Sequence, residues 1–344
     1  MNTRLIHALK CPDCQGVDLK THAFQLAGDE TENGMIICNS CHSWYPIVDS
    51  IPVVSVTPVV VDKWKQALRL KWGESFDFSS LKDTGSVPAS SKAASAQQEQ
   101  IEFYDQEANR YDAEITDTIF WRSFTKQTVH EWGASEKTRA GLVLEVGCGT
   151  GASTVALAKL GCRIVALDIC LTAAKVAQAK IRDLGLSHAV DFIVSEAEAL
   201  PFRPGLFQSC IFSGVLHHVS NPVEVLKQIS SILSEGGEIY GHENNASAFR
   251  FIFDLLMKMN PLWHEEAGAH PLLESKKTKE WGRDAGLDIR TQSLVFLPPH
   301  FFNLFPQPLA ETLLKLTNGF FGWIPWLKDQ GGLMIISGTK GASV

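Results

Sequence analysis

The stretch from Leu142 to Gly151 constrains the fold of this chain more than any other. A run of four apolar residues and one acid, Leu142–Val146, leads into three glycines at alternate positions, and a segment with helical spacing, Ala152–Lys159, follows. This order predicts a buried strand, a tight turn and a helix, because glycine adopts backbone conformations that other residues avoid. Such a turn lets a ligand approach bare backbone at the end of a strand. We therefore expect a nucleotide-like ligand at this glycine turn.

The chain after this turn alternates between strand-like and helix-like patterns. This alternation predicts an α/β fold, a doubly wound, seven-stranded, mainly parallel sheet of Rossmann-like type. Between Gln100 and the glycine turn, aromatic residues recur at steps of three and four, which is typical of helices. The expected strands are Leu142–Val146, Arg163–Asp168, Asp191–Ser195, Ser209–Ser213, Gly237–Gly241, Ile289–Phe296 and Leu333–Ser337.

Two close pairs of cysteines mark the N-terminal part as a separate unit. Cys11 pairs with Cys14 and Cys38 with Cys41, and 23 residues separate the pairs. Four thiolates at this spacing form the tetrahedral set that structural zinc prefers. A segment this short has little core, so a metal would contribute much of its folding free energy. The alternative is four free thiols or a redox pair. The other cysteines lie scattered in or beside apolar strands, which indicates a reducing, cytoplasmic setting.

Three parts follow from these patterns. We expect a small zinc ribbon in residues 1–60 and the α/β domain in residues 100–344. Residues 61–99 should connect them through a short helix and a flexible linker, because Lys82–Gln98 is small, polar and free of aromatic residues. The chain has no apolar run of about eighteen residues, so we expect no transmembrane segment.

The zinc ribbon resembles a known family. Cys38–Cys41 is followed by Trp44–Val54, which contains a Tyr-Pro-Ile segment and an Ile-Pro turn. This part resembles the zinc-ribbon domain of small methyltransferase activator subunits over about residues 1–57. The resemblance implies a protein partner that is bound through the ribbon.

The glycine turn fits two cofactor classes. With Ala152 it satisfies G-x-G-x-x-A, a form of the dinucleotide fingerprint, and Asp168 stands 21 residues after Gly147, where an acid accepts hydrogen bonds from ribose hydroxyls in either class. Glu145 suits a cationic amino group and would repel a pyrophosphate. Further along, Ser195–Phe202 places an acid and a backbone amide where the edge of an adenine could be read. A dehydrogenase stays as the alternative at this point.

Together with Ser213–Val219, which follows the fourth expected strand, these motifs resemble the class I S-adenosylmethionine-dependent methyltransferases, especially the branch of ubiquinone- and sterol-type enzymes. The resemblance covers about residues 100–340 and implies the Rossmann-like methyltransferase fold, with S-adenosylmethionine as cofactor. It places the methionine end at Glu145 and the glycine turn, and the ribose hydroxyls at Asp168. It also places adenine against Ile169.

The adenine edge would be read by Glu196 and the Ala197 amide, although the family usually has Asp where Glu196 stands. Tyr104 and Tyr111 resemble the aromatic N-terminal segment that closes over the cofactor. The expected cofactor-binding residues are therefore Tyr104, Tyr111, Glu145, Gly147, Cys148, Gly149, Gly151, Asp168, Ile169, Glu196, Ala197 and Ser213.

Methyl transfer from a sulfonium needs mainly alignment of the reactants in a dry pocket. A general base is needed only where the acceptor must lose a proton. His217, His218 and His242 are the expected catalytic residues, because histidine titrates near working pH and these three lie at the carboxyl edge of the sheet. The alternative is that the His-His pair only shapes the turn after the strand.

Two apolar insertions in the α/β domain indicate the acceptor. They span about residues 244–274 and 297–332, and the second is rich in aromatic residues. Apolar segments over an active site suit a small hydrophobic or lipid-like acceptor, or a surface that dips into a membrane. An accessory core or a dimer interface would explain them equally well.

The alternative function is an RNA base methyltransferase that holds RNA with its zinc ribbon. The net charge of −7 and four acids of the ribbon, Asp13, Asp29, Glu30 and Glu32, argue against nucleic acid. A third class is a non-catalytic regulatory subunit, which the unbroken glycine turn disfavours.

Overall fold

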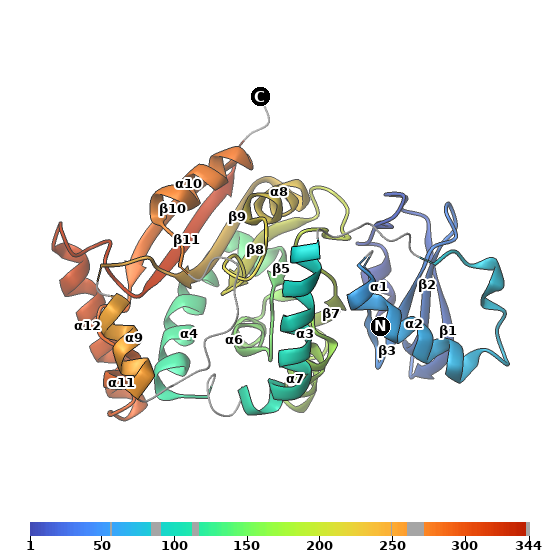
Figure 1. Ribbon diagram of the computed structural model, residues 1–344, viewed down its shortest axis with the longest axis horizontal. Coiled ribbons are helices and arrows are strands. Elements are labelled where there is room, and N and C mark those ends of the chain that lie inside the picture. The colour runs from blue at the N-terminus through green and yellow to red at the C-terminus, as the bar shows by residue number, and fades with distance from the viewer. Residues whose placement is uncertain (56, 84–90, 112–116, 249, 260–271, 342–344) are drawn as a thin grey trace.

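Two β-sheets organise the molecule (Figure 1). The computed structural model describes residues 1–55, 57–83, 91–111, 117–248, 250–259 and 272–341. Within these ranges, a four-stranded antiparallel sheet forms the N-terminal part and a seven-stranded sheet with helices on both faces follows. The small sheet lies at one end of the long axis of the molecule.

The N-terminal sheet is built from consecutive hairpins. Gly28 turns the first hairpin at φ +61°, a conformation that favours glycine. Helix α2 (Pro58–Trp72) covers the sheet, and its Leu68 packs with Met35, Trp44 and Phe78 in a small separate core. The other elements here are α1 Thr3–Ile6, β1 Leu19–Ala27, β2 Glu30–Cys38, β3 Trp44–Val48, β4 Ile51–Pro52 and the 3₁₀ turn Phe78–Ser80.

The segment that was predicted to be a flexible linker is partly helical. Residues 84–90 lie outside the described ranges, but α3 begins at Ser91 and continues to Tyr111. Alanine, glutamine and glutamate are good helix formers, and the helix buries Ile101 and Ala108 further along. The linker prediction was therefore wrong for residues 91–98, because a small, polar composition does not distinguish a coil from the end of a helix.

The seven strands of the large sheet have the order β10-β11-β9-β8-β5-β6-β7. Strands β5 to β9 pair in parallel, and β11 runs antiparallel to both β9 and β10. This confirms the predicted doubly wound, mainly parallel sheet. The strands are β5 Leu142–Val146, β6 Arg163–Asp168, β7 Val190–Val194, β8 Phe207–Ser213, β9 Leu233–Asn244, β10 Leu287–Leu294 and β11 Leu333–Lys340.

Side chains of the inner strands alternate between two cores. Val143 and Ile164 belong to one cluster, while Leu144 and Val165 belong to the other. The first cluster packs against α4, α6 and α7, and the second against α8 and α10. This two-residue period is what a sheet buried on both faces requires. The helices are α4 Ile119–Trp132, α5 Glu136–Ala140, α6 Ala152–Lys159, α7 Leu171–Asp183, α8 Pro222–Ile232 and α10 Ser275–Asp284.

The topology places the glycine turn at the switch point of the sheet. Strand β5 lies between β6 and β8, so the chain leaves it to one side first and returns later on the other. Open α/β sheets bind ligands at the carboxyl ends of strands at such a point.

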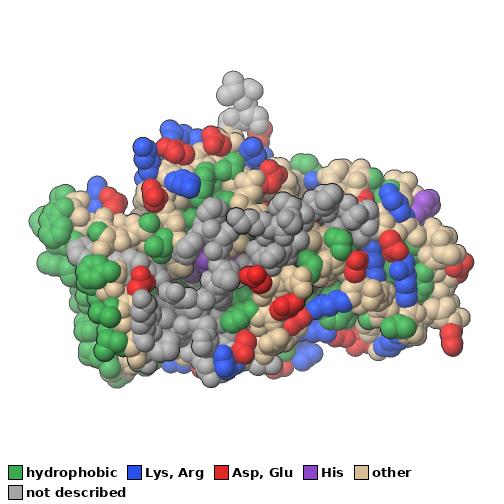
Figure 2. All heavy atoms as spheres, viewed as in Figure 1, with side chains coloured by type: hydrophobic (Ala, Val, Ile, Leu, Met, Phe, Trp, Pro, Cys, Tyr) green, Lys and Arg blue, Asp and Glu red, His purple; other side chains and the backbone are tan. Residues whose placement is uncertain are grey.

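Three further helices form an apolar end of the molecule, α9 (Arg250–Met259), α11 (Pro299–Phe302) and α12 (Gln307–Trp323). They lie beside α4, far from the N-terminal sheet, and Figure 2 shows hydrophobic side chains gathered there. The inner residues pack with Phe120 and Phe124 of α4 in a third core. Of the predicted insertions, residues 260–271 lie outside the described ranges.

The zinc ribbon covers the exposed edge of the large sheet at β7. Val53 and Val194 form a parallel bridge, and the Val54 amide donates to the Val194 carbonyl at 2.9 Å. Nearby, the Lys10 amide donates to the Pro201 carbonyl at 3.0 Å. An uncovered edge strand would present unpaired backbone groups to other chains, so this contact completes the sheet.

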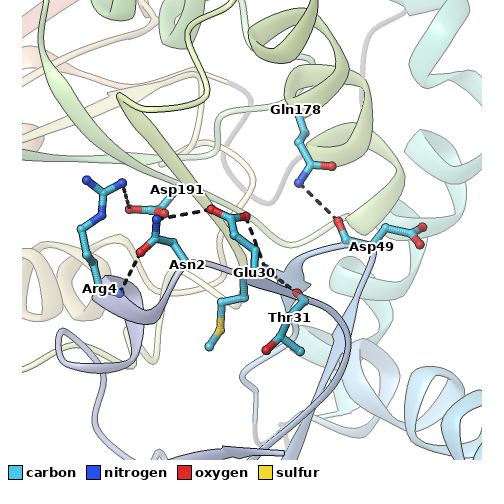
Figure 3. A network of polar contacts seen from close by, with 8 residues as sticks. Asn2, Arg4, Glu30, Thr31, Asp49, Gln178 and Asp191 are labelled. Carbon is cyan, nitrogen blue, oxygen red and sulfur yellow. Dashed lines mark hydrogen bonds and ion pairs between the residues drawn. The ribbon is translucent and has the colours of Figure 1, made fainter. Parts of the chain in front are cut away.

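Polar side chains surround this contact (Figure 3). Arg4 lies 3.9 Å from Asp191 of β7, and the Gln178 amide of α7 donates to the Asp49 carbonyl at 3.3 Å. The amino group of Met1 is buried, donates to the Thr31 carbonyl, and has its pKa lowered to about 6 by that burial. The ribbon and the α/β domain thus contact each other through backbone, apolar and polar groups together.

Candidate functional site

The three glycines of the turn have different neighbours. All three adopt left-handed backbone, with φ of +71° at Gly147, +51° at Gly149 and +87° at Gly151. A Cβ at Gly147 would lie 2.4 Å from Val215, and one at Gly151 would lie 2.7 Å from Ala177, whereas one at Gly149 would meet nothing within 4 Å. Gly147 and Gly151 therefore allow close packing, and Gly149 faces open space that a ligand can enter.

Asp168 joins the glycine turn to the next strand. Its carboxylate accepts the Gly149 amide at 2.7 Å and the Cys170 amide at 2.9 Å, and only 7% of the residue is exposed. The Gly147 and Cys148 amides both donate to the Leu167 carbonyl. The acid that was predicted to bind ribose hydroxyls thus also holds the open glycine in place.

Glu145 is buried beneath the same turn. Its carboxylate accepts the Thr154 hydroxyl at 2.6 Å, and burial raises the pKa of Glu145 to about 8, with the charge of Asp168 adding to the effect. A cation beside the carboxylate would lower this pKa. The role of Glu145 toward the amino group of the cofactor stays a prediction.

Glu196 follows β7 and faces the zinc ribbon. Its residue is 2% exposed, and one carboxylate oxygen accepts the Thr57 hydroxyl at 3.1 Å. Burial raises the pKa of Glu196, and hydrogen bonds from Ser55 and Thr57 oppose that rise. Among the described residues, none hydrogen-bonds the other carboxylate oxygen. This unpartnered buried oxygen lies one residue after Ser195, whose amide donates to the Asp168 carbonyl, and it fits a ligand that carries a donor group.

The remaining predicted cofactor-binding residues lie at the carboxyl edge of the sheet and on α3. Ile169 and Ala197 are half-buried at the carboxyl edge, and Ser213 ends β8. Tyr104 is half-buried on α3 with its ring edge-on to Phe103 at 5.3 Å, while the Tyr111 side chain lies outside what the structure describes. Closure of these tyrosines over the cofactor stays a prediction.

A histidine and a buried glutamate meet where β8 and β9 end. His217 Nδ1 lies 2.7 Å from a carboxylate oxygen of Glu243, whose other oxygen accepts the amides of Val215 and Leu216 at 2.8 and 2.7 Å. Burial alone would raise the pKa of Glu243, but these hydrogen bonds hold it below its usual value. Glu243 is fully buried and the His217 side chain is 12% exposed. The pair has the arrangement of a histidine base oriented by a carboxylate.

The other two predicted histidines differ from His217. The His218 ring lies 3.9 Å from the His217 ring. His242 sits among the rings of Trp121, Phe124 and Trp132, and burial lowers its pKa to about 4. His217 thus contacts a carboxylate, and the catalytic role of all three histidines stays a prediction.

The four ribbon cysteines converge on one point. Their sulfurs lie within 4.8 Å of one another, with 3.6 Å between Cys11 and Cys41 and between Cys14 and Cys38. Tetrahedral Zn–S bonds of about 2.3 Å place sulfurs roughly 3.8 Å apart, so the set fits zinc. The Tyr45 hydroxyl contacts the Cys11 sulfur and donates to Asp13 at 2.7 Å, which orients this ligand.

The sequence did not identify Ser55 and Thr57 as residues of this site, and it did not predict that Glu243 pairs with His217. Thr57 precedes Pro58 and carries a helix-start signal, which predicts a cap and not a contact 139 positions away. Glu243 lies next to His242 in the sequence, and only the alternation of a strand would have turned it toward His217.

The reversed seventh strand, the glycine turn at the switch point and the acid that ends β6 define a class I S-adenosylmethionine-dependent methyltransferase. Residues 144–241 match the family described as "Methyltransferase domain", and residues 2–50 match the "Trm112p-like protein" family. The chain is therefore a methyltransferase that uses S-adenosylmethionine and carries a Trm112-like ribbon with a structural zinc.

Curated relatives share part of the chain. The ubiquinone biosynthesis O-methyltransferase of Pseudomonas paraeruginosa is 29% identical over 160 residues, 44% of this chain and 68% of that protein. The enzyme of the same name from Xanthomonas campestris is 34% identical over 99 residues, 28% of this chain and 41% of its own length. The matches thus leave about a third of the first relative and more than half of the second uncovered, so the acceptor does not follow from them.

A solved complex has the same fold. The structure of the Trm112 methyltransferase activator with a methyltransferase from Haloferax volcanii aligns at a TM-score of 0.52 and 17% identity, over 71% of this chain and 98% of the matched chain. Across the part of the chain that the structure describes, no helix has the length and apolar character to span a bilayer.

Proposed function

We propose that this enzyme transfers the methyl group of S-adenosylmethionine to a hydroxyl of a small apolar acceptor, with His217 as general base. The observation that carries the proposal is the 2.7 Å contact between His217 Nδ1 and the buried carboxylate of Glu243. An activated sulfonium needs a base only when the acceptor must lose a proton, as a hydroxyl does. The named relatives are O-methyltransferases, which supports the same choice.

The cofactor would lie along the carboxyl edge of the sheet. We assign its methionine end to the glycine turn above Glu145, its ribose hydroxyls to Asp168, and its adenine to Ile169, Glu196 and Ala197. Gly149 supports this assignment, because it is the glycine whose missing side chain leaves open space. Tyr104 and Tyr111 would close the site from α3.

The Glu243–His217 pair would move the proton. With Nδ1 protonated toward Glu243, the lone pair lies on Nε2, which takes the hydroxyl proton as the acceptor oxygen bonds to the methyl carbon and the carbon–sulfur bond breaks. The buried carboxylate then stabilises the imidazolium. S-Adenosylhomocysteine, the methylated oxygen and a protonated His217 are the products of this step.

The apolar end supports an apolar acceptor. Side chains that are 62% to 83% exposed project from α12 and the loop after it, namely Phe320, Trp323, Trp326 and Leu316. On α9, Phe251 and Met259 are also exposed. Tryptophan favours the boundary between water and lipid, and this surface could collect an acceptor that resides in a membrane.

The zinc ribbon would act as a built-in activator. The Haloferax complex pairs a Trm112 activator with a separate methyltransferase, whereas here a Trm112-like ribbon and a methyltransferase domain share one chain. We infer that the protein partner of the ribbon is its own catalytic domain, through the contact with β7. We also assign the domains as residues 1–60 for the ribbon and about 91–344 for the catalytic part.

Two observations disfavour RNA as the acceptor. The net charge of the chain is −7, and part of the ribbon surface is already buried against β7 of its own catalytic domain. The test incubates the protein with methyl-labelled S-adenosylmethionine and either phenolic and quinol lipids or total RNA. Label in the organic phase supports the proposal. Label in RNA, with binding that falls steeply between low and high salt, would replace it with the RNA function.

A further inference from the structure

Thr57 occupies an unusual position at the exit of the ribbon. It is the N-cap of α2, where a threonine hydroxyl commonly accepts an amide of its own helix. Here no side-chain cap forms, and the hydroxyl donates to Glu196 at 3.1 Å instead. The Thr57 amide donates to the Ser55 hydroxyl oxygen at 2.9 Å, and the Ser55 hydroxyl lies 3.5 Å from the Thr57 carbonyl. The Thr57 hydroxyl thus holds the carboxylate, and Ser55 holds Thr57.

The clamp on Glu196 is anchored on both sides. Ser55 follows Val54, whose amide is bonded to Val194 of β7, two residues before Glu196. The Ser195 amide donates to the Asp168 carbonyl at 3.0 Å, which fixes the loop beside the strand that carries the ribose acid. Ser55 and Glu196 are 1% and 2% exposed, so water does not compete for these bonds. The carboxylate therefore has one orientation.

That orientation leaves one oxygen of Glu196 unused. Among the described residues no group hydrogen-bonds its Oε2, although the side chain is buried. Buried carboxylate oxygens require donors, so this atom calls for one from outside the protein. The adenine of the cofactor offers a 6-amino donor beside a ring nitrogen acceptor. A carboxylate followed by the Ala197 amide complements that edge.

We propose that Thr57, whose backbone is held by Ser55, is a positioning residue for cofactor binding: its hydroxyl holds Glu196 so that the second carboxylate oxygen receives the 6-amino group of the adenine. The ribbon then sets cofactor affinity through a hydroxyl group that never touches the cofactor. The inference rests on the proposed cofactor site and adds its control by the ribbon. It also explains the glutamate, because an aspartate would be one methylene shorter and would fall back from Thr57.

The test measures calorimetric affinity of the full-length zinc protein for two ligands. One is S-adenosylhomocysteine, and the other is its analogue with hydrogen in place of the 6-amino group. Thr57→Val should weaken the first about tenfold and the second less than twofold, since only the first uses the clamped oxygen. Thr57→Ser keeps the hydroxyl and should restore affinity. Thr312→Val, on the exposed face of α12, is the matched control.

Kinetics give a second readout. Thr57→Val should raise KM for S-adenosylmethionine and leave kcat unchanged, with the same melting temperature as Thr57→Ser. Equal weakening of both ligands, or no weakening, would overturn the inference. Failure of the unmodified protein to bind S-adenosylhomocysteine would instead overturn the proposed cofactor site.

Discussion

The two ends of the seven-stranded sheet are finished in opposite ways. At β7 the zinc ribbon pairs with the edge strand and hydrogen-bonds the buried carboxylate of Glu196, so this end of the sheet is closed. At the β10 end, α9 and α12 present exposed aromatic side chains. Under the proposed function, the β7 end would bind the cofactor through specific hydrogen bonds, and the β10 end would bind the acceptor through apolar contact.

Zinc removal should have the largest effect on the closed end. Structural zinc contributes on the order of 10 kcal/mol to folding of small zinc domains, so Cys38→Ser should abolish cooperative unfolding of the ribbon and weaken S-adenosylhomocysteine binding together. Cys162→Ser, a buried cysteine on the far side of the glycine turn, is the matched control. Metal content, circular dichroism melting and calorimetry are the measurements. Full cofactor affinity in a zinc-free protein would break the link between ribbon and cofactor.

The Glu243–His217 pair tests the chemistry between the two ends. His217→Asn and Glu243→Gln should each lower kcat about 10² to 10⁴-fold with little change in affinity for S-adenosylhomocysteine, because a general base acts only on the acceptor proton. His130→Asn, exposed at the end of α4, is the control for loss of an imidazole. Variants that retain kcat would show that the pair only shapes the turn.

Substitutions in the glycine turn should separate cofactor binding from folding stability. Gly149→Ala should weaken cofactor binding at least about tenfold, because a methyl group would enter the open space and the left-handed backbone costs about 1 kcal/mol. Gly151→Ala should mainly lower the melting temperature, since its methyl group would meet Ala177. Calorimetry and melting separate the two. Equal effects on binding and stability at both positions would contradict the assignment.

Polar substitutions at the apolar end should weaken acceptor and membrane binding without unfolding the protein. Trp323→Glu with Trp326→Glu should raise KM for a lipid-bound acceptor several-fold and reduce flotation with neutral vesicles, while KM for a short water-dispersed acceptor stays the same. α12 carries only Glu311 and Lys315 as charged residues, so anionic lipid should add little. Binding that requires anionic lipid would contradict an apolar contact.

The smallest effect on stability is expected at the Arg4–Asp191 ion pair, beside the contact between the ribbon and β7. Arg4 and Asp191 lie 3.9 Å apart with the arginine half exposed, and such pairs contribute about 0–1 kcal/mol. Arg4→Ala should therefore shift the unfolding free energy by less than about 1 kcal/mol in urea titration. A loss comparable to that of Cys38→Ser would mean that side-chain charge, and not backbone pairing, holds the ribbon in place.

Features encoded by neighbouring residues could be predicted from the sequence. The four cysteines, the glycine turn and the seven strands all follow from local spacing, and the ends of β5 and β6 agree with the predicted ones. β9 begins at Leu233 in place of Gly237 and ends at Asn244 in place of Gly241. Glycine normally interrupts a strand, and the pairing with β8 is irregular between Leu233 and Glu238, but pairing with β8 and β11 continues from Glu238 through Gly241.

Features that depend on tertiary contacts could not be predicted. Nothing near Thr57 in the sequence indicates that its hydroxyl leaves its own helix for Glu196. The helix at Ser91 is stabilised where Asp105 accepts the Thr172 hydroxyl at 2.6 Å, a contact across α3 and α7. His217 and His242 look alike as sequence, and only their surroundings distinguish a carboxylate-bound histidine from one among aromatic rings.

The most direct test is a single-turnover transfer from methyl-labelled S-adenosylmethionine to a panel of phenolic and quinol acceptors. The wild-type enzyme should place label in an organic-extractable methyl ether, and His217→Asn should do so at least about 100-fold more slowly while binding S-adenosylhomocysteine normally. A wild-type enzyme that binds the cofactor but methylates no hydroxyl acceptor, or equal rates in both proteins, would contradict hydroxyl methylation by a Glu243-oriented His217.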